Sequence, residues 1–493
     1  MSNVARFWRL ACPLALLSVA ASALPAPKPV LGYNTWNAFR TNIDEQLIRD
    51  TADRLVETGL AAAGYTYLNI DDGWSEKRRD GSGCLVAHRR RFPSGMAALA
   101  EHVHSRGLRF GIYGDAGKRT CAGYPGSRGH EEVDAETWAQ WGVDLLKYDN
   151  CNYDAHDWDP VPRYTAMRDA LNATGRPITF SLCNWGWLRP WLWADKVGHS
   201  WRTTGDIEPT WDSMMEVLDA NADLARFSWP DRDWGDADML EVGNGKLTLG
   251  EQRAHFALWA LLKSPLLIGT DLRSIHPDSL AILKAREVIA INQDSLGVPG
   301  DLVWVEGDLR VYAAPLAGGS RAVVLLNAGS SGPANITVSW TQLGLPAGAA
   351  AAARDLFGQC DLGDFAGAFS AAVPPHDVAV LRLAPLSSSN SSTAADNGWR
   401  PWHQLHAQLP PRQPRGSAKG WLLAGAAAVA VLLAAATVAV VRRRRRAGGS
   451  GWRQLGGTDG TAIAASGSVQ LGPAVLVGPA VRIGRGGKPD EQV

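Results

Sequence analysis

Residues 31–294 repeat one theme: a short apolar run, a polar residue at its end, and then a longer amphipathic stretch. The eight runs read LGYNTW, YTYLNIDD, LRFGIYGD, VDLLKYDN, PITFSLCNWG, SWRTTGDI, WGDADML and SPLLIGTD. Helix-like segments such as IDEQLIRDTADRLVETGLAAAG and GMAALAEHVHSRG lie between them. Strands that alternate with helices form parallel sheets. Eight strands over this length predict an α/β fold, one (β/α)8 TIM barrel covering residues 31–298.

An open, doubly wound sheet is the alternative fold. Its nucleotide-binding examples carry a glycine-rich phosphate loop after the first strand. No such loop follows LGYNTW, so the closed barrel is favoured. Active sites of such barrels lie at the C-terminal ends of the strands, where the carboxylates of this chain fall.

The pattern changes from about residue 300. LVWVEGDLRVYAAPL, SRAVVLLNAG, ANITVSW and HDVAVLRLAPL alternate apolar and polar residues and are joined by Gly and Pro. Alternation with period two indicates half-buried strands. We predict a C-terminal antiparallel β-sandwich domain over residues 300–385.

Both ends of the chain predict a secreted, membrane-anchored protein. Arg6 and Arg9 precede an apolar stretch that ends in ASA, which is typical of a signal peptide over residues 1–23. A signal anchor is the alternative, but the stretch is too short to span a bilayer. Residues 421–441 carry no charge and would form a helix about 31 Å long, enough for one transmembrane helix.

Five arginines follow that helix directly, which favours a cytosolic tail. Residues 387–419 are polar and predict a disordered stalk, and residues 442–493 predict a basic, disordered tail. We therefore predict a type I membrane protein of the secretory pathway, with the lipid bilayer as a partner. Its catalytic domain would be extracellular or lumenal, with a vacuole- or lysosome-like compartment as one option.

Composition excludes one class of partner. Lys and Arg together number 49, as do Asp and Glu, and the net charge is zero. A neutral chain gives no electrostatic reason to bind nucleic acid. The 21 Trp outnumber the 10 Phe and 9 Tyr, which fits either core packing or a pocket for sugar rings.

Cysteines and sequons agree with an oxidising compartment. Removal of the signal peptide leaves five cysteines, an odd number, so at least one stays a free thiol: Cys84, Cys121, Cys151, Cys183 and Cys360. Candidate glycosylation sites are Asn172, Asn335 and Asn390.

Several carboxylates fall at the predicted strand ends, namely Asp71, Asp72, Asp149, Asp206 and Asp238. A metal site would favour interspersed His ligands, and no strand end carries a His, so we predict no metal and no cofactor. Cleavage of a glycosidic bond needs two carboxyl groups that flank the bond. The carboxylates and the Trp surplus therefore favour a glycosidase.

The stretch WGVDLLKYDNC, residues 141–151, places a cation and a carboxylate on one face of a strand. Residues two apart on a strand point the same way, so Lys147 and Asp149 lie together. A neighbouring ammonium favours the ionised carboxylate. Schiff-base chemistry at Lys147 is the rival interpretation, but the carboxylate opposes the loss of its proton.

Longer motifs resemble one known family. LGYNTWNAF, YLNIDDGW, FGIYGDAGKRTCAGYPGSRGHEEVDAETWAQWGVDLLKYDNC, SWRTTGDI, DADMLEVGN and VIAINQDSLGVPG are similar to the eukaryotic α-galactosidases of glycoside hydrolase family twenty-seven. The resemblance covers residues 31 to 385. It implies a retaining hydrolase that removes terminal α-linked galactose from oligosaccharides, polysaccharides or glycoconjugates.

The resemblance also implies residue roles. Asp149 matches the nucleophile and Asp206 the acid/base, whose carboxyl groups lie about 5–5.5 Å apart in retaining enzymes. Asp71 and Asp72 match the pair that binds the 4- and 6-hydroxyls of galactose. The further predicted substrate-binding residues are Trp36, Tyr113, Cys121, Lys147, Cys183, Asn184, Trp185, Arg202 and Asp238. Of these, Arg202 and Asp238 match residues near the 2-hydroxyl and the acid/base, and Cys121 matches the partner of Cys151 in a family disulfide.

Two departures from the family pattern stand out. Thr41 and Gly73 occupy the places of a cysteine pair, so a second disulfide is missing. Asn184 stands where α-galactosidases carry a Glu that accepts from the 2-hydroxyl, which predicts weaker recognition there. The alternatives are an α-N-acetylgalactosaminidase, a β-L-arabinopyranosidase, or a catalytically weak sugar-binding membrane ectodomain. The intact Asp71 and Asp72 pair argues against the arabinoside.

Overall fold

The computed structural model of the protein describes residues 28–228 and 233–386. The predicted signal peptide, stalk, membrane helix and tail, together with Asn390, lie outside these ranges. Within the described ranges, no helix is long and apolar enough to cross a membrane. Secretion and membrane anchoring therefore stay predictions from the sequence.

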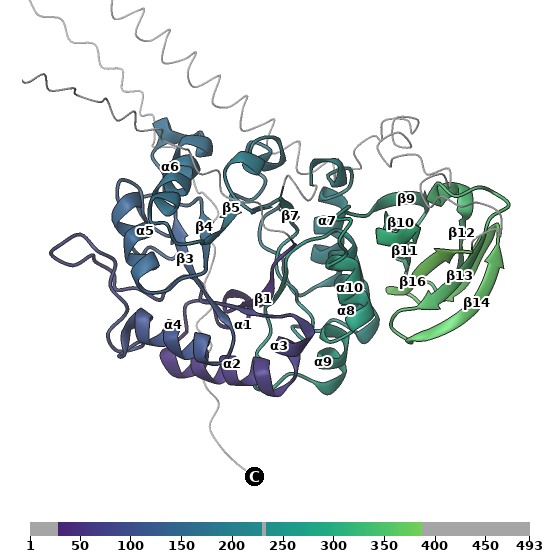
Figure 1. Ribbon diagram of the computed structural model, residues 1–493, viewed down its shortest axis with the longest axis horizontal. Helices are drawn as coiled ribbons and strands as arrows, with labels where there is room; N and C mark the ends of the chain where they lie inside the picture. Colours follow the sequence, from purple (N-terminus) through teal and green to yellow (C-terminus); the bar gives the residue numbers. More distant parts are fainter. Residues whose placement is uncertain (1–27, 229–232, 387–493) are drawn as a thin grey trace, which may run out of the picture. The chain divides into compact units, whose positions relative to one another are not determined.

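Eight parallel strands form the first sheet and coincide with the eight apolar runs (Figure 1). They are β1 (Leu31–Asn34), β2 (Tyr67–Asn69), β3 (Arg109–Asp115), β4 (Leu145–Asp149), β5 (Thr179–Cys183), β6 (Ser200–Arg202), β7 (Trp234–Asp236) and β8 (Leu266–Ile268). Neighbours follow chain order from β1 to β7, and β8 pairs with β1. Leu240, shortly after β7, forms a parallel bridge with Ile268 of β8 and so joins the two ends of the sheet. The sheet is TIM-barrel-like, and the doubly wound alternative is wrong.

Helices connect the strands. They are α1 (Trp36–Phe39), α2 (Glu45–Glu57), α3 (Leu60–Ala63), α4 (Gly95–Ser105), α5 (Glu131–Gln140), α6 (Pro160–Ala173), α7 (Trp211–Ala220), α8 (Leu249–Leu261), α9 (Pro277–Leu283) and α10 (Arg286–Asn292). Local sequence sets where they begin: Asp44 accepts a hydrogen bond from Leu47 N ahead of α2. Thr248 and Glu251 form a reciprocal capping box at the start of α8.

The second domain is antiparallel, as predicted. Its strands are β9 (Asp301–Glu306), β10 (Leu309–Pro315), β11 (Arg321–Asn327), β12 (Ala334–Ser339), β13 (Ala350–Asp355), β14 (Cys360–Ala366), β15 (Ala368–Val373) and β16 (Asp377–Pro385). Six of them pair in the order β14-β13-β16-β11-β10-β9, and β12 pairs with β15. Val323 and Leu325 of β11 belong to the core of this domain.

The other face of β11 belongs to the barrel core. Val324 and Leu326 alternate with the residues just named and share a hydrophobic cluster with α8. Arg253 of α8 forms an ion pair with Asp377 of β16. The alternation predicted for the second domain does not hold in β11, whose residues are all buried, and burial on both faces explains its continuous apolar run.

The tryptophans divide between the two roles that composition left open. Trp138, Trp201, Trp234, Trp259 and Trp340 are buried and fill the core. Trp158, Trp185 and Trp187 keep between 37% and 56% of their surface exposed. Core packing accounts for the first group and not for the second.

Two predicted glycosylation sites fall within the described ranges. Asn172 lies near the end of α6 and Asn335 in β12, and both side chains are exposed. Exposure makes both sites accessible, and their modification stays a prediction.

Candidate active site

One cavity of about 280 Å³ opens at the C-terminal ends of the barrel strands. Most of the predicted site residues line it: Trp36, Asp71, Asp72, Tyr113, Cys121, Lys147, Asp149, Trp185 and Asp206. Gly205, which the sequence analysis did not single out, lines it as well. Parallel strands of a barrel end on one rim, so residues far apart in sequence meet there.

Asp149 ends β4 and is almost completely buried, with 6% of its surface exposed. Tyr113 Oη donates a hydrogen bond to Asp149 Oδ2 at 2.9 Å, and Asn150 N donates to Oδ1 at 2.9 Å. Burial raises the pKa of Asp149 to about 6, although Lys147 and the two hydrogen bonds lower it. The carboxylate is therefore held by donors but poorly solvated.

Lys147 shares the cavity with Asp149, as strand alternation predicted, but its ion pair is with another carboxylate. Lys147 Nζ lies 2.7 Å from Asp71 Oδ2. As expected, Lys147 lowers the Asp149 pKa and so favours the carboxylate, but burial raises that pKa by more than the cation lowers it. Nearby carboxylates, with Asp71 first among them, oppose the effect of burial and raise the pKa of Lys147. A charged Lys147 does not suit Schiff-base chemistry.

Asp71 and Asp72 follow β2 and are fixed by hydrogen bonds from several directions. Asn34 Nδ2 donates to Asp71 Oδ2 at 2.9 Å, and Ala122 N donates to Asp72 Oδ2 at 2.8 Å. Gly73 N donates to Asp72 Oδ1 at 2.7 Å. Burial raises the pKa of Asp72 above its ordinary value. Two buried, oriented carboxylates can accept hydroxyl groups of a ligand with little reorganisation.

Asp206 lies four residues after the end of β6 and is far more accessible than Asp149, with 46% of its side chain exposed. Arg202 Nη2 donates to Asp206 Oδ1 at 3.1 Å, and Arg202 Nη1 lies 2.9 Å from Asp238 Oδ1. Burial opposes ionisation of Asp206, but Arg202 and then Lys147 outweigh it and lower the Asp206 pKa. Asp238 Oδ2 also accepts from Ile207 N at 2.8 Å, which fixes the chain beside Asp206. Arg202 thus contacts Asp206 directly and Asp238 holds Arg202, and neither of the two lines the cavity.

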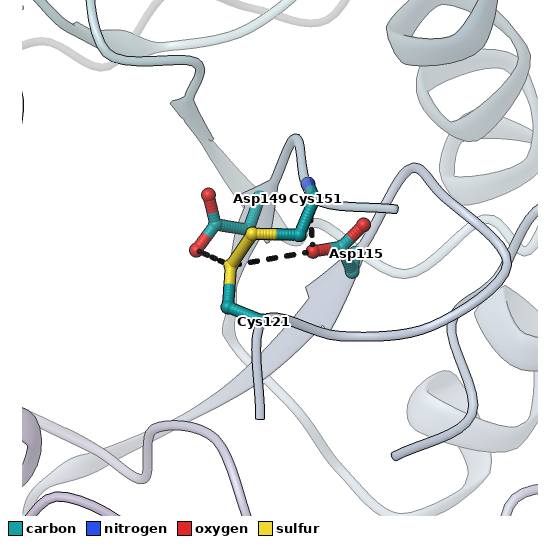
Figure 2. A group of neighbouring side chains, drawn as sticks. All are labelled: Asp115, Cys121, Asp149 and Cys151. Atoms are coloured by element: carbon teal, nitrogen blue, oxygen red, sulfur yellow. Dashed lines mark hydrogen bonds between the residues drawn. A yellow bond between two sulfur atoms is a disulfide. The ribbon is translucent and has the colours of Figure 1, made fainter. Parts of the chain in front are cut away.

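The predicted disulfide between Cys121 and Cys151 is confirmed, with a Cα–Cα distance of 5.2 Å. Figure 2 shows it between two carboxylates: Cys121 Sγ lies 3.4 Å from Asp149 Oδ2 and 3.8 Å from Asp115 Oδ2. Cys151 N donates to Asp115 Oδ2 at 3.1 Å. Because both sulfurs are joined, neither is a thiolate ligand for a metal ion. The disulfide instead closes the loop beside Asp149.

Two adjacent predicted residues lie away from the cavity: Cys183, which ends β5, and Asn184, which follows it. Cys183 is a free, buried thiol that lines a small space inside the barrel, with Arg202 Nη1 at 3.7 Å from its sulfur. Asn184 is fully buried, and its Nδ2 donates to the Trp187 carbonyl at 2.9 Å. Asn184 thus holds a turn through its Nδ2, while its Oδ1 is buried without a hydrogen-bond partner among the described residues. The contact predicted between Asn184 and a sugar hydroxyl stays a prediction.

The structure also shows what stands where the second disulfide of the family is missing. A Cβ built on Gly73 would lie 2.9 Å from Thr41 Cβ, so the two positions adjoin. Arg91 donates to both backbones, to Thr41 O at 2.6 Å and to Gly73 O. The guanidinium of Arg91 joins the two segments without a covalent bond, a contact that the sequence motifs did not indicate.

A TIM-barrel-like sheet that brings one buried and one accessible carboxylate to a single cavity is the arrangement of a glycoside hydrolase. Comparison with known proteins identifies the family. The chain belongs to the α-galactosidase family: residues 28–294 match the family described as alpha galactosidase A. Residues 306–383 match the alpha galactosidase C-terminal beta sandwich domain.

Relatives and solved structures agree with this assignment. The chain is 52% identical over 358 residues to an α-galactosidase of Coffea arabica, covering 72% of this chain and 94% of that protein. It is similar to the crystal structure of α-galactosidase I from Mortierella vinacea, with 37% identity, a TM-score of 0.70 and coverage of 75% and 100%. It is also similar to the structure of α-galactosidase from Saccharomyces cerevisiae with raffinose, with 34% identity, a TM-score of 0.69 and coverage of 73% and 98%.

Proposed function

We propose that this protein removes terminal α-linked galactose by double displacement, with Asp149 as the nucleophile and Asp206 as the acid/base. One observation carries the proposal: the two carboxylates line the same small cavity, from the end of β4 and from just beyond β6. Their surroundings differ as two distinct roles require, since Asp149 is buried among donors and Asp206 is half exposed.

In the first step, an Asp149 carboxylate oxygen attacks the anomeric carbon of the galactosyl group. The bond from that carbon to the leaving oxygen breaks, and this oxygen takes the proton of Asp206. The product is a galactosyl ester on Asp149 and an ionised Asp206. Tyr113 Oη, at 2.9 Å from Asp149 Oδ2, orients the attacking carboxylate.

In the second step, Asp206 accepts a proton from water, and the water oxygen attacks the anomeric carbon. The ester bond breaks, which returns Asp149 as a carboxylate and releases galactose with its original anomeric configuration. Arg202 lowers the pKa of Asp206, but the base has to be ionised in this step, so the contact favours it.

Galactose would be recognised by Asp71, Asp72 and Lys147 at the bottom of the cavity. Buried carboxylates that accept ligand hydroxyls discriminate strongly, because a sugar without the matching hydroxyl leaves them unpaired. Trp36 and Tyr113 line the same cavity and supply apolar walls. The volume of about 280 Å³ lies at the lower end for ligand pockets and suits one sugar ring.

The substrate would be a saccharide of the raffinose type, as the relative from Saccharomyces cerevisiae with raffinose suggests. The two neighbouring glycosidase activities are less favoured. Relatives 52% and 50% identical to the chain are α-galactosidases, which disfavours a 2-acetamido substrate. The complete Asp71 and Asp72 pair suits a ligand that has a 6-hydroxyl. We also propose a lumenal or extracellular site of action, on the basis of the N- and C-terminal sequences alone.

Hydrolysis of nitrophenyl α-galactoside, beside its 2-acetamido and β-L-arabinopyranoside counterparts, tests the proposal. We expect turnover of the galactoside well above both others, and retained configuration by proton NMR at early times. Asp149→Asn should remove turnover while galactose still binds. Inverted product, or an Asp149→Asn variant as active as wild type, would contradict the proposed mechanism. Galactose binding without turnover in the wild-type protein would instead favour the sugar-binding ectodomain.

A further inference from the structure

Two neighbouring loops beside the cavity expose large apolar side chains. Trp158, between β4 and α6, is 56% exposed, and Trp187, after β5, is 48% exposed. Leu188 and Leu192 of the second loop are 40% and 57% exposed. We call these four residues the aromatic ridge. Single exposed apolar residues are ordinary, but a cluster of them marks a surface that binds something.

Hydrogen bonds hold the ridge in one arrangement. Trp187 Nε1 donates to the Trp158 carbonyl at 3.3 Å and so ties the two loops together. Two hydrogen bonds from Asn184 hold the turn that contains Trp187. The backbone O of Asn184 accepts from Trp187 N at 2.9 Å, and its side-chain Nδ2 donates to Trp187 O at 2.9 Å. Gly186 N donates to Arg202 O at 3.1 Å, which anchors the turn to β6. The indole of Trp187 is therefore presented by a fixed turn.

The backbone of this turn is strained. Trp185, Leu188 and Arg189 have φ values of 58°, 54° and 53°, in the left-handed region that such side chains rarely adopt. A Cβ on Gly186 would meet Thr203 O at 2.3 Å, so only glycine fits between this turn and the chain that follows β6. Residues in this region are energetically unfavourable and are concentrated at functional sites. The strain supports a binding role for the side chains that the turn presents.

The ridge continues the active-site cavity. Trp185 lines the cavity, and Trp187 follows two residues later in the same turn. The cavity suits one sugar ring, so the part of the substrate beyond the glycosidic oxygen has to lie outside it. Asp206, which would protonate that oxygen, follows β6, the strand to which the turn is anchored. The leaving group would therefore emerge on the side of the turn.

We propose that the aromatic ridge binds the second and third sugar rings of the leaving group, so that the preferred substrates are saccharides longer than a disaccharide. This proposal rests on the proposed function. The flat apolar faces of pyranose rings suit indole surfaces, which combine a large contact area with little conformational entropy to lose.

A lipid surface is the other ligand that would suit exposed Trp and Leu side chains. Asp157 and Asp159 flank Trp158 directly, and insertion of Trp158 into a bilayer would bring these carboxylates toward the apolar phase. Asp157 forms an ion pair with Arg128, and Asp159 accepts a hydrogen bond from Val161 N at the start of α6, so both carboxylates are held within this polar loop. The observations therefore favour a saccharide.

The test compares two substrates in the full-length protein: nitrophenyl α-galactoside, with one small leaving group, and a tetrasaccharide that ends in α-galactose. The variants are Trp158→Ala, Trp187→Ala and the double substitution, and Leu296→Ala is the matched control, because Leu296 is 39% exposed outside the ridge. We expect the double variant to lose about tenfold in kcat/KM for the tetrasaccharide, which corresponds to about 1.4 kcal/mol. Its kcat/KM for the nitrophenyl substrate and both values for Leu296→Ala should stay within about twofold of wild type.

The outcomes separate the two proposals. Wild-type protein that hydrolyses neither substrate would contradict the proposed function. Wild-type protein that hydrolyses both, with equal losses or none in the double variant, would overturn the ridge as a saccharide site. An unchanged substrate ratio together with weaker binding of the double variant to phosphatidylcholine vesicles would assign the ridge to a membrane surface and likewise overturn the proposal.

Discussion

Lys147 Nζ lies 2.7 Å from Asp71 Oδ2, so the cation of β4 pairs with the carboxylate that follows β2, two strands away in the barrel. Asp149, two residues further along the same strand as Lys147, receives its hydrogen bonds from Tyr113 and Asn150 instead. The Lys147–Asp71 pair thus belongs to the proposed galactose-binding end of the cavity.

Replacement of Lys147 tests this relationship. Lys147→Met removes the cation that pairs with the buried Asp71 carboxylate, and breaking a buried ion pair is strongly unfavourable. We expect kcat/KM for nitrophenyl α-galactoside to fall about 100-fold or more, with a large rise in KM. Lys118→Met is the control, since Lys118 forms an exposed pair with Asp154 and should leave kcat/KM within about twofold. Equal kinetics in both variants would refute the role of the pair.

The pH dependence of kcat/KM follows from the two carboxylates. The proposed reaction needs Asp149 ionised and Asp206 protonated, but burial raises the Asp149 pKa to about 6 while Arg202 holds the Asp206 pKa below its ordinary value. The reactive form is then a minor one that is populated most between the two pKa values. We expect a bell-shaped profile with an acidic optimum and an alkaline limb near pH 6 that belongs to Asp149.

Tyr113→Phe identifies which carboxyl sets that limb. The Tyr113 hydroxyl lowers the Asp149 pKa, so its removal should move the alkaline limb of the kcat/KM profile to higher pH. If Asp206 set the alkaline limb, the substitution would move the acid limb instead, and the assignment of the two pKa values would have to be reversed.

Arg91 offers a test of stability near the site. Arg91 donates to the carbonyls of Thr41 and Gly73, where the family disulfide is absent. We expect Arg91→Leu to lower the free energy of unfolding by about 2 kcal/mol, seen as a lower Tm, and to raise KM more than it lowers kcat, because Gly73 follows Asp71 and Asp72 directly. Arg90→Leu, at an exposed neighbouring position, serves as the control. Unchanged Tm in Arg91→Leu would show that the contact contributes nothing to stability.

Most of the fold follows from the sequence pattern. Short apolar runs that end in polar residues, each followed by an amphipathic stretch, located all eight barrel strands, and period-two alternation located the antiparallel domain. Alternation also predicted that Lys147 and Asp149 lie on one side of their strand, and both line the cavity. Tyr148, between them, lies in the core and packs edge-on against Tyr164. These features depend on local geometry, which the order of residues determines.

Contacts between distant segments could not be predicted in the same way. The choice of Asp71 as the partner of Lys147 depends on the spacing of β2 and β4, and the burial that raises the Asp149 pKa depends on the closed rim. Asn184 faces a carbonyl three residues ahead because its turn is strained, which no motif indicates. The Arg91 contact and the aromatic ridge likewise arise from loops that meet only in the folded chain.

Asn184→Asp distinguishes the two roles considered for this residue. A carboxylate cannot donate to the Trp187 carbonyl, so the turn loses a hydrogen bond worth about 1 kcal/mol. We expect kcat/KM for the tetrasaccharide to fall about fivefold while that for nitrophenyl α-galactoside stays within about twofold. A similar fall for both substrates would show that Asn184 acts on the galactose ring itself.

The most direct test of the account is the position of the covalent galactosyl ester. The protein would be incubated with a fluorinated α-galactosyl fluoride that slows the second step, digested with pepsin, and examined by mass spectrometry. If Asp149 is the nucleophile, we expect the sugar on the peptide that contains KYDNC, attached to Asp149, and no label in Asp149→Asn. A label on Asp206 or Asp71, or turnover of the reagent with inversion and no ester, would contradict it.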